Sequence, residues 1–163
     1  MLARLTSGIA LASIAALVLV GCTPPEPSDD EVLAEARESF DSFYQTVDEQ
    51  MAAGSASATD FEEYATRELA AQWAQDVQAV IDDGTTSRGV LEVVDLALVD
   101  RSDDRISTHL CTDGRNITTT HPDGSMQEPS GLVAWSATFV PRDDSSRLLL
   151  ASLDPIQDQA ICE

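Results

Sequence analysis

His109 comes nearest, in residue type and position, to a catalytic base. It falls in an expected strand, two positions before Cys111 and therefore on the same strand face, from which it could project into a pocket. A histidine base needs a carboxylate or carbonyl partner to fix its tautomer. The alternative is a histidine at the surface or at a pocket rim, which is the commoner environment for a lone histidine. The other histidine, His121, precedes Pro122 in a turn and is expected in solvent.

Three further side chains have chemistry that a pocket could use. Tyr64 falls on an apolar helical stripe, Trp135 lies in an expected strand, and Asp95 interrupts an aliphatic strand. A buried aspartate would have a raised pKa and could act as an acid or base, whereas an alternating solvent face explains Asp95 more simply. Tyrosine and tryptophan on such stripes are more often core residues with a polar tip. We treat His109, Trp135, Tyr64 and Asp95 as possible pocket residues.

Motifs for metal, phosphate or nucleophile chemistry are absent from the sequence. It contains no H-E-x-x-H, no Cys/His zinc cluster, no G-x-S-x-G and no glycine-rich phosphate loop. Its adjacent acidic pairs fall at expected turns and helix ends, without the ligand spacing of a calcium loop. We therefore assign no catalytic residue, expect no metal and no cofactor, and leave enzymatic activity open while favouring a non-catalytic role.

The first residues have the organisation of an export signal. Arg4 supplies positive charge, and residues 5–20 form an uncharged apolar stretch, shorter than the ~20 apolar residues that span a membrane comfortably. The stretch ends in LVGC at residues 19–22, which resembles the lipobox of bacterial lipoproteins. In that family the cysteine carries a diacylglyceryl group, and the chain is cut before it, here between Gly21 and Cys22. The alternative is an ordinary secreted protein with a chance cysteine at the cleavage site.

Net charge limits the partners of the chain. The sequence has 29 acidic and 9 basic residues, every basic one arginine, for a formal net charge of −20. Such a surface is repelled by nucleic acid and by anionic lipid headgroups. We therefore expect no nucleic-acid partner, and attachment to the extracytoplasmic face of the cell membrane through lipid on Cys22. A protein of the cell envelope is the other expected partner.

Three segments follow from this organisation. Residues 1–21 are the expected signal peptide, and residues 22–30 are the lipidated cysteine with a tether rich in proline and acid. Proline keeps such a tether extended and unable to pack. Residues 31–163 have the length of a single domain with one core.

The first half of this domain has a helical period. Capping boxes begin at Ser28 and Thr59, each followed by apolar residues at three- and four-residue steps. Gly54 and Gly84 are expected to terminate the helices. The expected helices cover residues 31–52 and 59–82, and the second has room for a break near residues 66–67.

The second half has the alternating pattern of strands separated by polar turns. Helices followed by a meander of strands predict an α+β fold, in which N-terminal helices pack on one face of an antiparallel sheet of four to six strands. The expected strands are residues 90–100, 105–113, 115–120, 125–127, 132–140 and 147–153.

Cys111 and Cys162 are the remaining cysteines once Cys22 carries lipid. Disulfides persist in exported proteins, so we predict a bond between this pair. It would pin the carboxyl-terminal tail to a sheet strand. The alternative is two free thiols, and without a C-x-x-C pair a redox role is not expected.

The order of these parts resembles a known family. The segments FYQTVDEQMAAG (43–54), VLEVVDLALVD (90–100) and HLCTDGRNITTTHPDG (109–124), with a Trp-bearing strand and a late cysteine, carry the resemblance. They are similar to small actinobacterial lipoproteins with a nuclear-transport-factor-two-like domain, also described as SnoaL-like or cystatin-like, and to Mce-associated proteins. The resemblance implies a strongly bent sheet around a long N-terminal helix, with a pocket at the open end. It departs at residues 143–147, where DDSSR replaces the glycine turn and tryptophan of the family.

Three classes of function remain open, because this fold hosts isomerases, dehydratases, cyclases and proteins without known activity. The first is a non-catalytic, membrane-tethered module that binds or supports an envelope protein. The second is a carrier of a small apolar ligand in the cone-shaped pocket. The third is a pocket enzyme of the isomerase or dehydratase type. A filled core favours the first class, a dry apolar cavity the second, and facing ionisable groups in a pocket the third.

Overall fold

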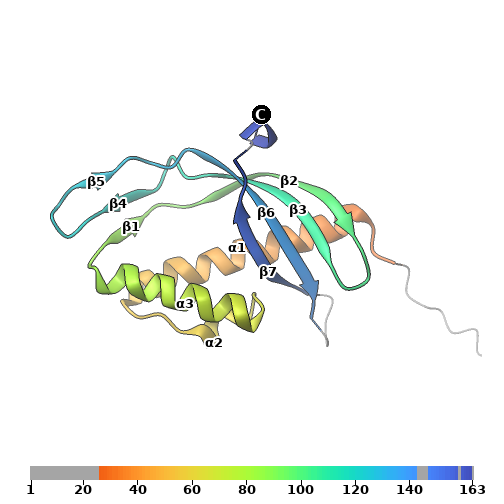
Figure 1. The fold of residues 1–163 in the computed structure, drawn as a ribbon, viewed down its shortest axis with the longest axis horizontal. Helices are drawn as coiled ribbons and strands as arrows, with labels where there is room; N and C mark the ends of the chain where they lie inside the picture. Colours follow the sequence, from red (N-terminus) through yellow and green to blue (C-terminus); the bar gives the residue numbers. More distant parts are fainter. Residues whose placement is uncertain (1–25, 143–146, 158, 163) are drawn as a thin grey trace, which may run out of the picture.

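The α+β architecture is confirmed: three helices lie on one side of a curved sheet (Figure 1). The computed structural model describes residues 26–142, 147–157 and 159–162. The expected signal peptide, the cleavage site at Gly21 and Cys22, and most of the tether lie outside the described residues, as does the turn at 143–146. Within the described ranges, no helix combines the length and the apolar character needed to cross a membrane.

Helix α1 (Asp29–Ala53) begins and ends where local sequence predicts. The Ser28 hydroxyl accepts from the backbone N–H of Glu31 at 3.3 Å, and the Glu31 carboxylate accepts from the backbone N–H of Ser28 at 2.7 Å. Gly54 closes the helix in the left-handed region, with φ of 71°, where it bonds back to the carbonyls of Gln50 and Met51. The capping box and the glycine stop are therefore both confirmed.

Replacing Ser28 with alanine is expected to lower the free energy of unfolding by about 1 kcal/mol, because it removes the side-chain acceptor of the cap. The urea midpoint of the variant would show this loss with an unchanged m-value. Ser55→Ala is the control, because Ser55 is exposed and its hydroxyl makes no hydrogen bond to a described residue. An equal midpoint for Ser28→Ala and the parent chain would contradict the proposed role of the cap.

The second helical region differs from the expectation at its start. Ser57, not Thr59, precedes α2 (Ala58–Phe61), and its side chain makes no capping hydrogen bond. The break expected near residues 66–67 is present, and α3 (Arg67–Asp82) follows it. The break has a tertiary cause, because residues around Ala65 pair with a strand. Leu150 donates its N–H to the carbonyl of Tyr64 and accepts from the N–H of Thr66, each at 2.9 Å.

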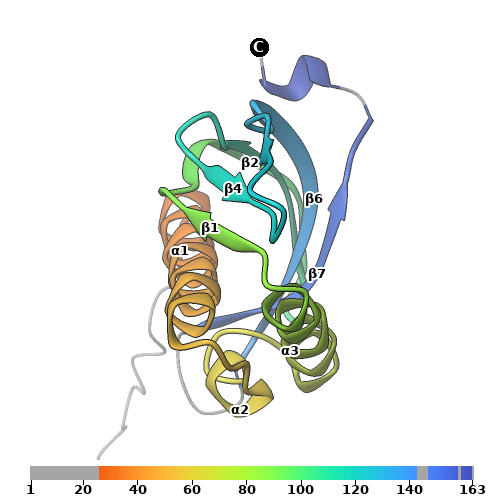
Figure 2. The same cartoon turned by 90° about the vertical axis from the view of Figure 1, so that its left-hand side faces the viewer.

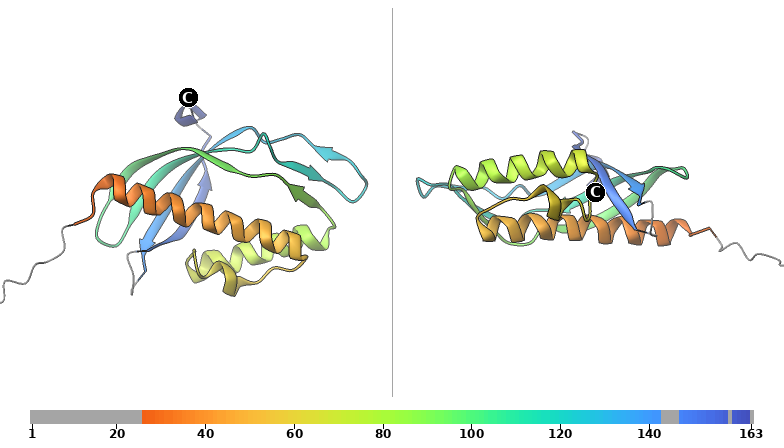
Figure 3. Two further views of the ribbon diagram at one scale, coloured as in Figure 1. Left: turned by 180° about the vertical axis from the view of Figure 1, so that it is seen from behind. Right: turned by 90° about the horizontal axis from the view of Figure 1, so that it is seen from below.

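The strands form two antiparallel sheets. The larger has the order β2-β3-β6-β7, and its four strands fall within the predicted four to six. The smaller, with the order β1-β4-β5, extends as an arm beyond the larger sheet (Figure 3). Sequence patterning did not predict β1 or this division. The strand bounds are β1 Thr86–Arg88, β2 Glu92–Arg101, β3 Ile106–Asp113, β4 Thr118–Thr120, β5 Met126–Gln127, β6 Leu132–Pro141 and β7 Leu148–Pro155.

The larger sheet curves over the helices (Figure 2). Register shifts occur between Val93 and Asp95 and between Leu98 and Asp100, where β2 pairs with β3. A further shift follows Thr138 in the pairing of β6 with β7. Extra residues of this kind bend a strand and increase its twist. The irregular edge strand β2 can therefore follow α1 along its length.

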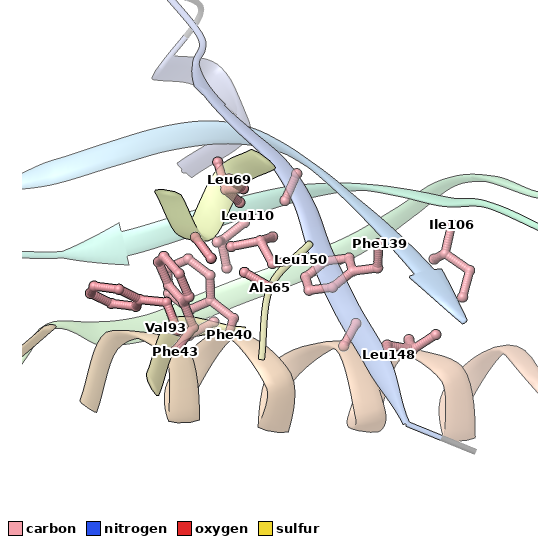
Figure 4. Packing of buried hydrophobic residues seen from close by; sticks show 14 of the residues in the cluster. Phe40, Phe43, Ala65, Leu69, Val93, Ile106, Leu110, Phe139, Leu148 and Leu150 are labelled. Carbon is pink, nitrogen blue, oxygen red and sulfur yellow. The ribbon is translucent and has the colours of Figure 1, made fainter. Parts of the chain in front are cut away.

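Side chains occupy the space between the sheet and the helices (Figure 4). Phe43 packs its ring against Phe61 and Trp73, with centroid distances of 5.3 and 5.2 Å. In the described part of the chain, every buried side-chain nitrogen or oxygen has a hydrogen-bond partner. The interior is therefore filled and polar groups within it are satisfied. The largest fully buried apolar side chains are Phe40, Phe43, Phe61, Phe139, Leu110 and Leu150.

Candidate binding groove between α1 and the start of β2

The structure does not gather the four possible pocket residues. His109 and Asp95 lie on the outer face of the large sheet, His109 half-buried and Asp95 exposed. Trp135 lies opposite Leu110 on the inner face, and its indole N–H donates to the Thr112 hydroxyl at 2.9 Å. Tyr64 lies between α2 and α3. The four therefore provide no common pocket in which an acid and a base face each other.

The predicted disulfide between Cys111 and Cys162 is present, with a Cα–Cα distance of 5.4 Å. Cys111 lies on the outer face of β3, next to β6. The bond holds the short 3₁₀ helix η1 (Gln159–Cys162) against β3 and β6 on the side away from the helices (Figure 1). It thereby covers part of the outer face that His109 shares.

A groove runs between α1 and the chain that leads into β2. Arg37, Asp41, Tyr44 and Asp48 line it from one stripe of α1, where their spacing of three and four residues places them on one face. The facing wall is residues 90–93. This hollow has a volume of about 520 Å³, and an adjoining hollow of about 400 Å³ continues past Asp48 toward β1.

Arg37 connects the two walls of the groove. Its guanidinium donates to the backbone carbonyl of Val93, and its Nε lies 3.9 Å from a carboxylate oxygen of Asp41. The contact with Val93 occupies an acceptor of the edge strand β2 and holds that strand against α1. Because Val93 and Asp41 engage the Arg37 guanidinium, the groove has more hydrogen-bond acceptors than free donors.

Three ionisable side chains of α1 in the groove have raised pKa values. Partial loss of solvent raises the pKa of Asp41, and the nearby Arg37 charge opposes this effect. Partial burial likewise raises the pKa of Asp48. Burial and then the charge of Asp48 raise the pKa of the Tyr44 phenol. A cation or a hydrogen-bond donor that enters the groove would therefore stabilise the charged form of both carboxylates. Asp48 in particular forms no ion pair with a described side chain.

The helical period of the sequence places Asp41 and Asp48 away from the apolar stripe, on the face that points to solvent. For an isolated helix that placement is correct, because the apolar stripe lies elsewhere. The groove exists because residues 90–93 pass over this acidic stripe, and no local pattern contains that information. Within the described ranges, no three His, Cys, Asp or Glu residues are arranged to hold a metal ion.

Asp113 provides a separate electrostatic feature at the end of β3. Its carboxylate accepts from the backbone N–H of Arg115 at 3.0 Å and from the guanidinium Nε at 2.9 Å. These bonds lower the pKa of Asp113 from 3.8 to about 2. Since the folded-state pKa is depressed, the stabilisation is present above the ordinary pKa and is lost as pH falls toward 2.

Asp113→Asn is expected to be destabilised at pH 7 and to lose part of the acid sensitivity of the parent chain. Urea unfolding at pH 7 and pH 3 measures both effects. Asp123→Asn, in an exposed turn, is a suitable comparison because the pKa of Asp123 is also lowered, through hydrogen bonds from Ser125. Parallel pH profiles for the parent and Asp113→Asn would contradict this assignment.

Comparisons with known proteins find solved structures of low similarity. No family model matches the sequence, and no curated protein matches it. A protein from Catenulispora acidiphila has 18% sequence identity and a TM-score of 0.49, covering 81% of this chain and 96% of that one. A protein from Xanthomonas campestris pv. campestris, described provisionally as a polyketide cyclase, has 12% identity and a TM-score of 0.31, covering 74% and 91%.

Proposed function

We propose that this chain is a lipid-tethered, extracytoplasmic module that binds another protein of the cell envelope and does not catalyse a reaction. The observation that carries the proposal is the filled interior. Phe40, Phe43, Phe61 and Phe139 are each at most 1% exposed and pack in the space between the sheet and the helices. The surface that carries the function is then on the outside of the domain.

The filled interior favours this role over the two alternatives. A carrier that encloses a small apolar ligand needs an enclosed apolar cavity, whereas large buried side chains pack between the sheet and the helices here. A pocket isomerase or dehydratase needs an acid and a base that face a common substrate position. Among the candidates, His109 and Asp95 share the outer face of the sheet but line neither hollow of the groove. Trp135 lies on the inner face, and Tyr64 lies between α2 and α3.

The groove between α1 and the start of β2 is the proposed contact surface. Asp41, Asp48 and Glu92 present carboxylates along it, and Tyr44 adds a hydroxyl. A basic, extended segment of a partner would meet complementary charge there, and complementary charge raises the association rate as well as specificity. The overall charge of −20 acts in the same direction.

Lipid attachment is tested at Cys22. We expect the mature chain in its own host to begin at Cys22 and to carry fatty acyl mass by intact mass spectrometry. Cys22→Ala is expected to move the protein from the membrane pellet to the soluble fraction. An unmodified amino terminus elsewhere, or unchanged fractionation of Cys22→Ala, would overturn the tether.

The binding surface is tested by site-specific photo-crosslinking in intact cells. A photoreactive residue at Gln45, which lines the groove and is exposed, is expected to capture an arginine- or lysine-rich segment of an envelope protein. The same group at Glu68, exposed on α3, serves as the positional control.

Asp41→Asn with Asp48→Asn should weaken capture, and the matched pair Asp95→Asn with Asp100→Asn should not. Equal capture from both positions would contradict the groove assignment.

A further inference from the structure

A second hollow, of about 470 Å³, lies at the amino-terminal end of α1 and away from the groove. Its deep wall is apolar: Val32 is 6% exposed, Ile106 5% and Leu148 7%. Figure 4 shows Ile106 and Leu148 at one end of the core, beyond Phe139. Pro27 and Pro141 extend the apolar lining to the surface. This surface suits a hydrocarbon chain.

We infer that this hollow shelters one acyl chain of the lipid group on Cys22. The inference rests on the proposed lipid attachment and adds a binding site for that lipid within the domain itself.

The position of the hollow along the chain favours this occupant. Glu26 and Pro27, the first described residues, line the hollow. Cys22 precedes Glu26 by four residues, which span at most ~14 Å when extended. A fatty acyl chain attached to Cys22 can therefore reach the apolar wall without any rearrangement of the domain.

Contacts of Arg101 hold the start of the described chain beside the hollow. Its guanidinium pairs with Asp29 at 2.9 Å and with Glu26 at 3.5 Å, although it belongs to β2. The Arg101 side chain is only 21% exposed, which limits the positions it can adopt. The two ion pairs hold Glu26 and Asp29 beside the hollow.

Charge at the rim distinguishes this occupant from free lipids. Glu31, Glu35 and Asp103 line the hollow, and Arg101, the one basic residue among its described lining, is already paired with carboxylates. The carboxylate of a free fatty acid or the phosphate of a phospholipid would be repelled here. A diacylglyceryl thioether carries no charge and is not repelled.

Occupancy of the hollow has a consequence for membrane attachment. A single acyl chain in a bilayer gives only marginal, reversible binding, whereas two chains give stable residence. If one of two chains enters the hollow, the remaining chain holds the membrane reversibly. The hollow thus provides a state in which the protein can leave one membrane without exposing both chains to water.

The test uses the full chain in its own host, grown with a fatty acid that carries a diazirine. After irradiation, mass spectrometry identifies what the acyl group on Cys22 has been joined to. We expect intramolecular crosslinks to peptides that contain Val32, Ile106 or Leu148.

Pro141→Glu, which places a charge at the mouth of the hollow, should remove these crosslinks, and Pro27→Glu should do the same from a separate position. Val99→Glu, on an exposed part of β2, should retain them.

Other outcomes overturn the inference in distinguishable ways. An acylated Cys22 crosslinked only to bilayer lipid would exclude the seated chain and leave the lipid tether standing. A Cys22 without acyl mass would exclude both. If Cys22→Ala protein captured the free diazirine fatty acid on the same peptides, the hollow would be a site for exchangeable ligands instead of the protein's own lipid.

Discussion

Phe43→Ala is expected to lower the free energy of unfolding by about 3–5 kcal/mol, a large part of the stability of a domain of this size. Phe43 is fully buried and belongs to α1, whereas its ring partners Phe61 and Trp73 belong to α2 and α3. One truncation therefore leaves a cavity where three helices meet. The T-shaped contact with Trp73, at an interplanar angle of 85°, is lost as well.

Urea unfolding monitored by tryptophan fluorescence measures this loss. Val99→Ala provides the matched control, since Val99 is 54% exposed and a surface substitution of this kind changes stability by at most about 0.5 kcal/mol. A loss below about 1 kcal/mol for Phe43→Ala would show that the three helices do not depend on this ring. The filled interior, on which the proposed function rests, would then need revision.

Reduction of the Cys111–Cys162 bond is expected to lower the free energy of unfolding by about 4 kcal/mol on the chain-entropy estimate. The bond joins residues separated by 51 positions, so it restricts a large part of the unfolded chain. Comparing the oxidised and reduced forms of the same chain keeps every side chain constant. Cys111→Ala with Cys162→Ala should reproduce the reduced form in urea.

Hydrogen exchange can locate the effect of this bond. We expect amides of η1 to exchange rapidly after reduction, because only contacts with β3 and β6 would then hold this short helix. Amides in the middle of β3, which pair on both sides, should remain slow. Equal unfolding midpoints for the oxidised and reduced forms would contradict a stabilising role.

Sequence alone determined the features that depend on neighbouring residues. The capping box at Ser28 and the glycine stop at Gly54 set both ends of α1, because these interactions close within one helical turn. Alternation predicted β3 and β6 because the two-residue period of a strand also depends only on neighbouring residues. The pairing of Cys111 with Cys162 was predicted on the expectation that Cys22 carries lipid, which left one possible pair among three cysteines.

Tertiary structure alone decided the features that depend on distant residues. The helix breaks before Arg67 because Tyr64 and Thr66 pair with Leu150, which lies far along the chain. The acidic stripe of α1 becomes one wall of a groove only because residues 90–93 cross it. His109 and Trp135 separate onto opposite faces because strand pairing and burial, not residue type, fix which face each occupies. Local patterns specify elements, but the packing of those elements decides which side chains meet.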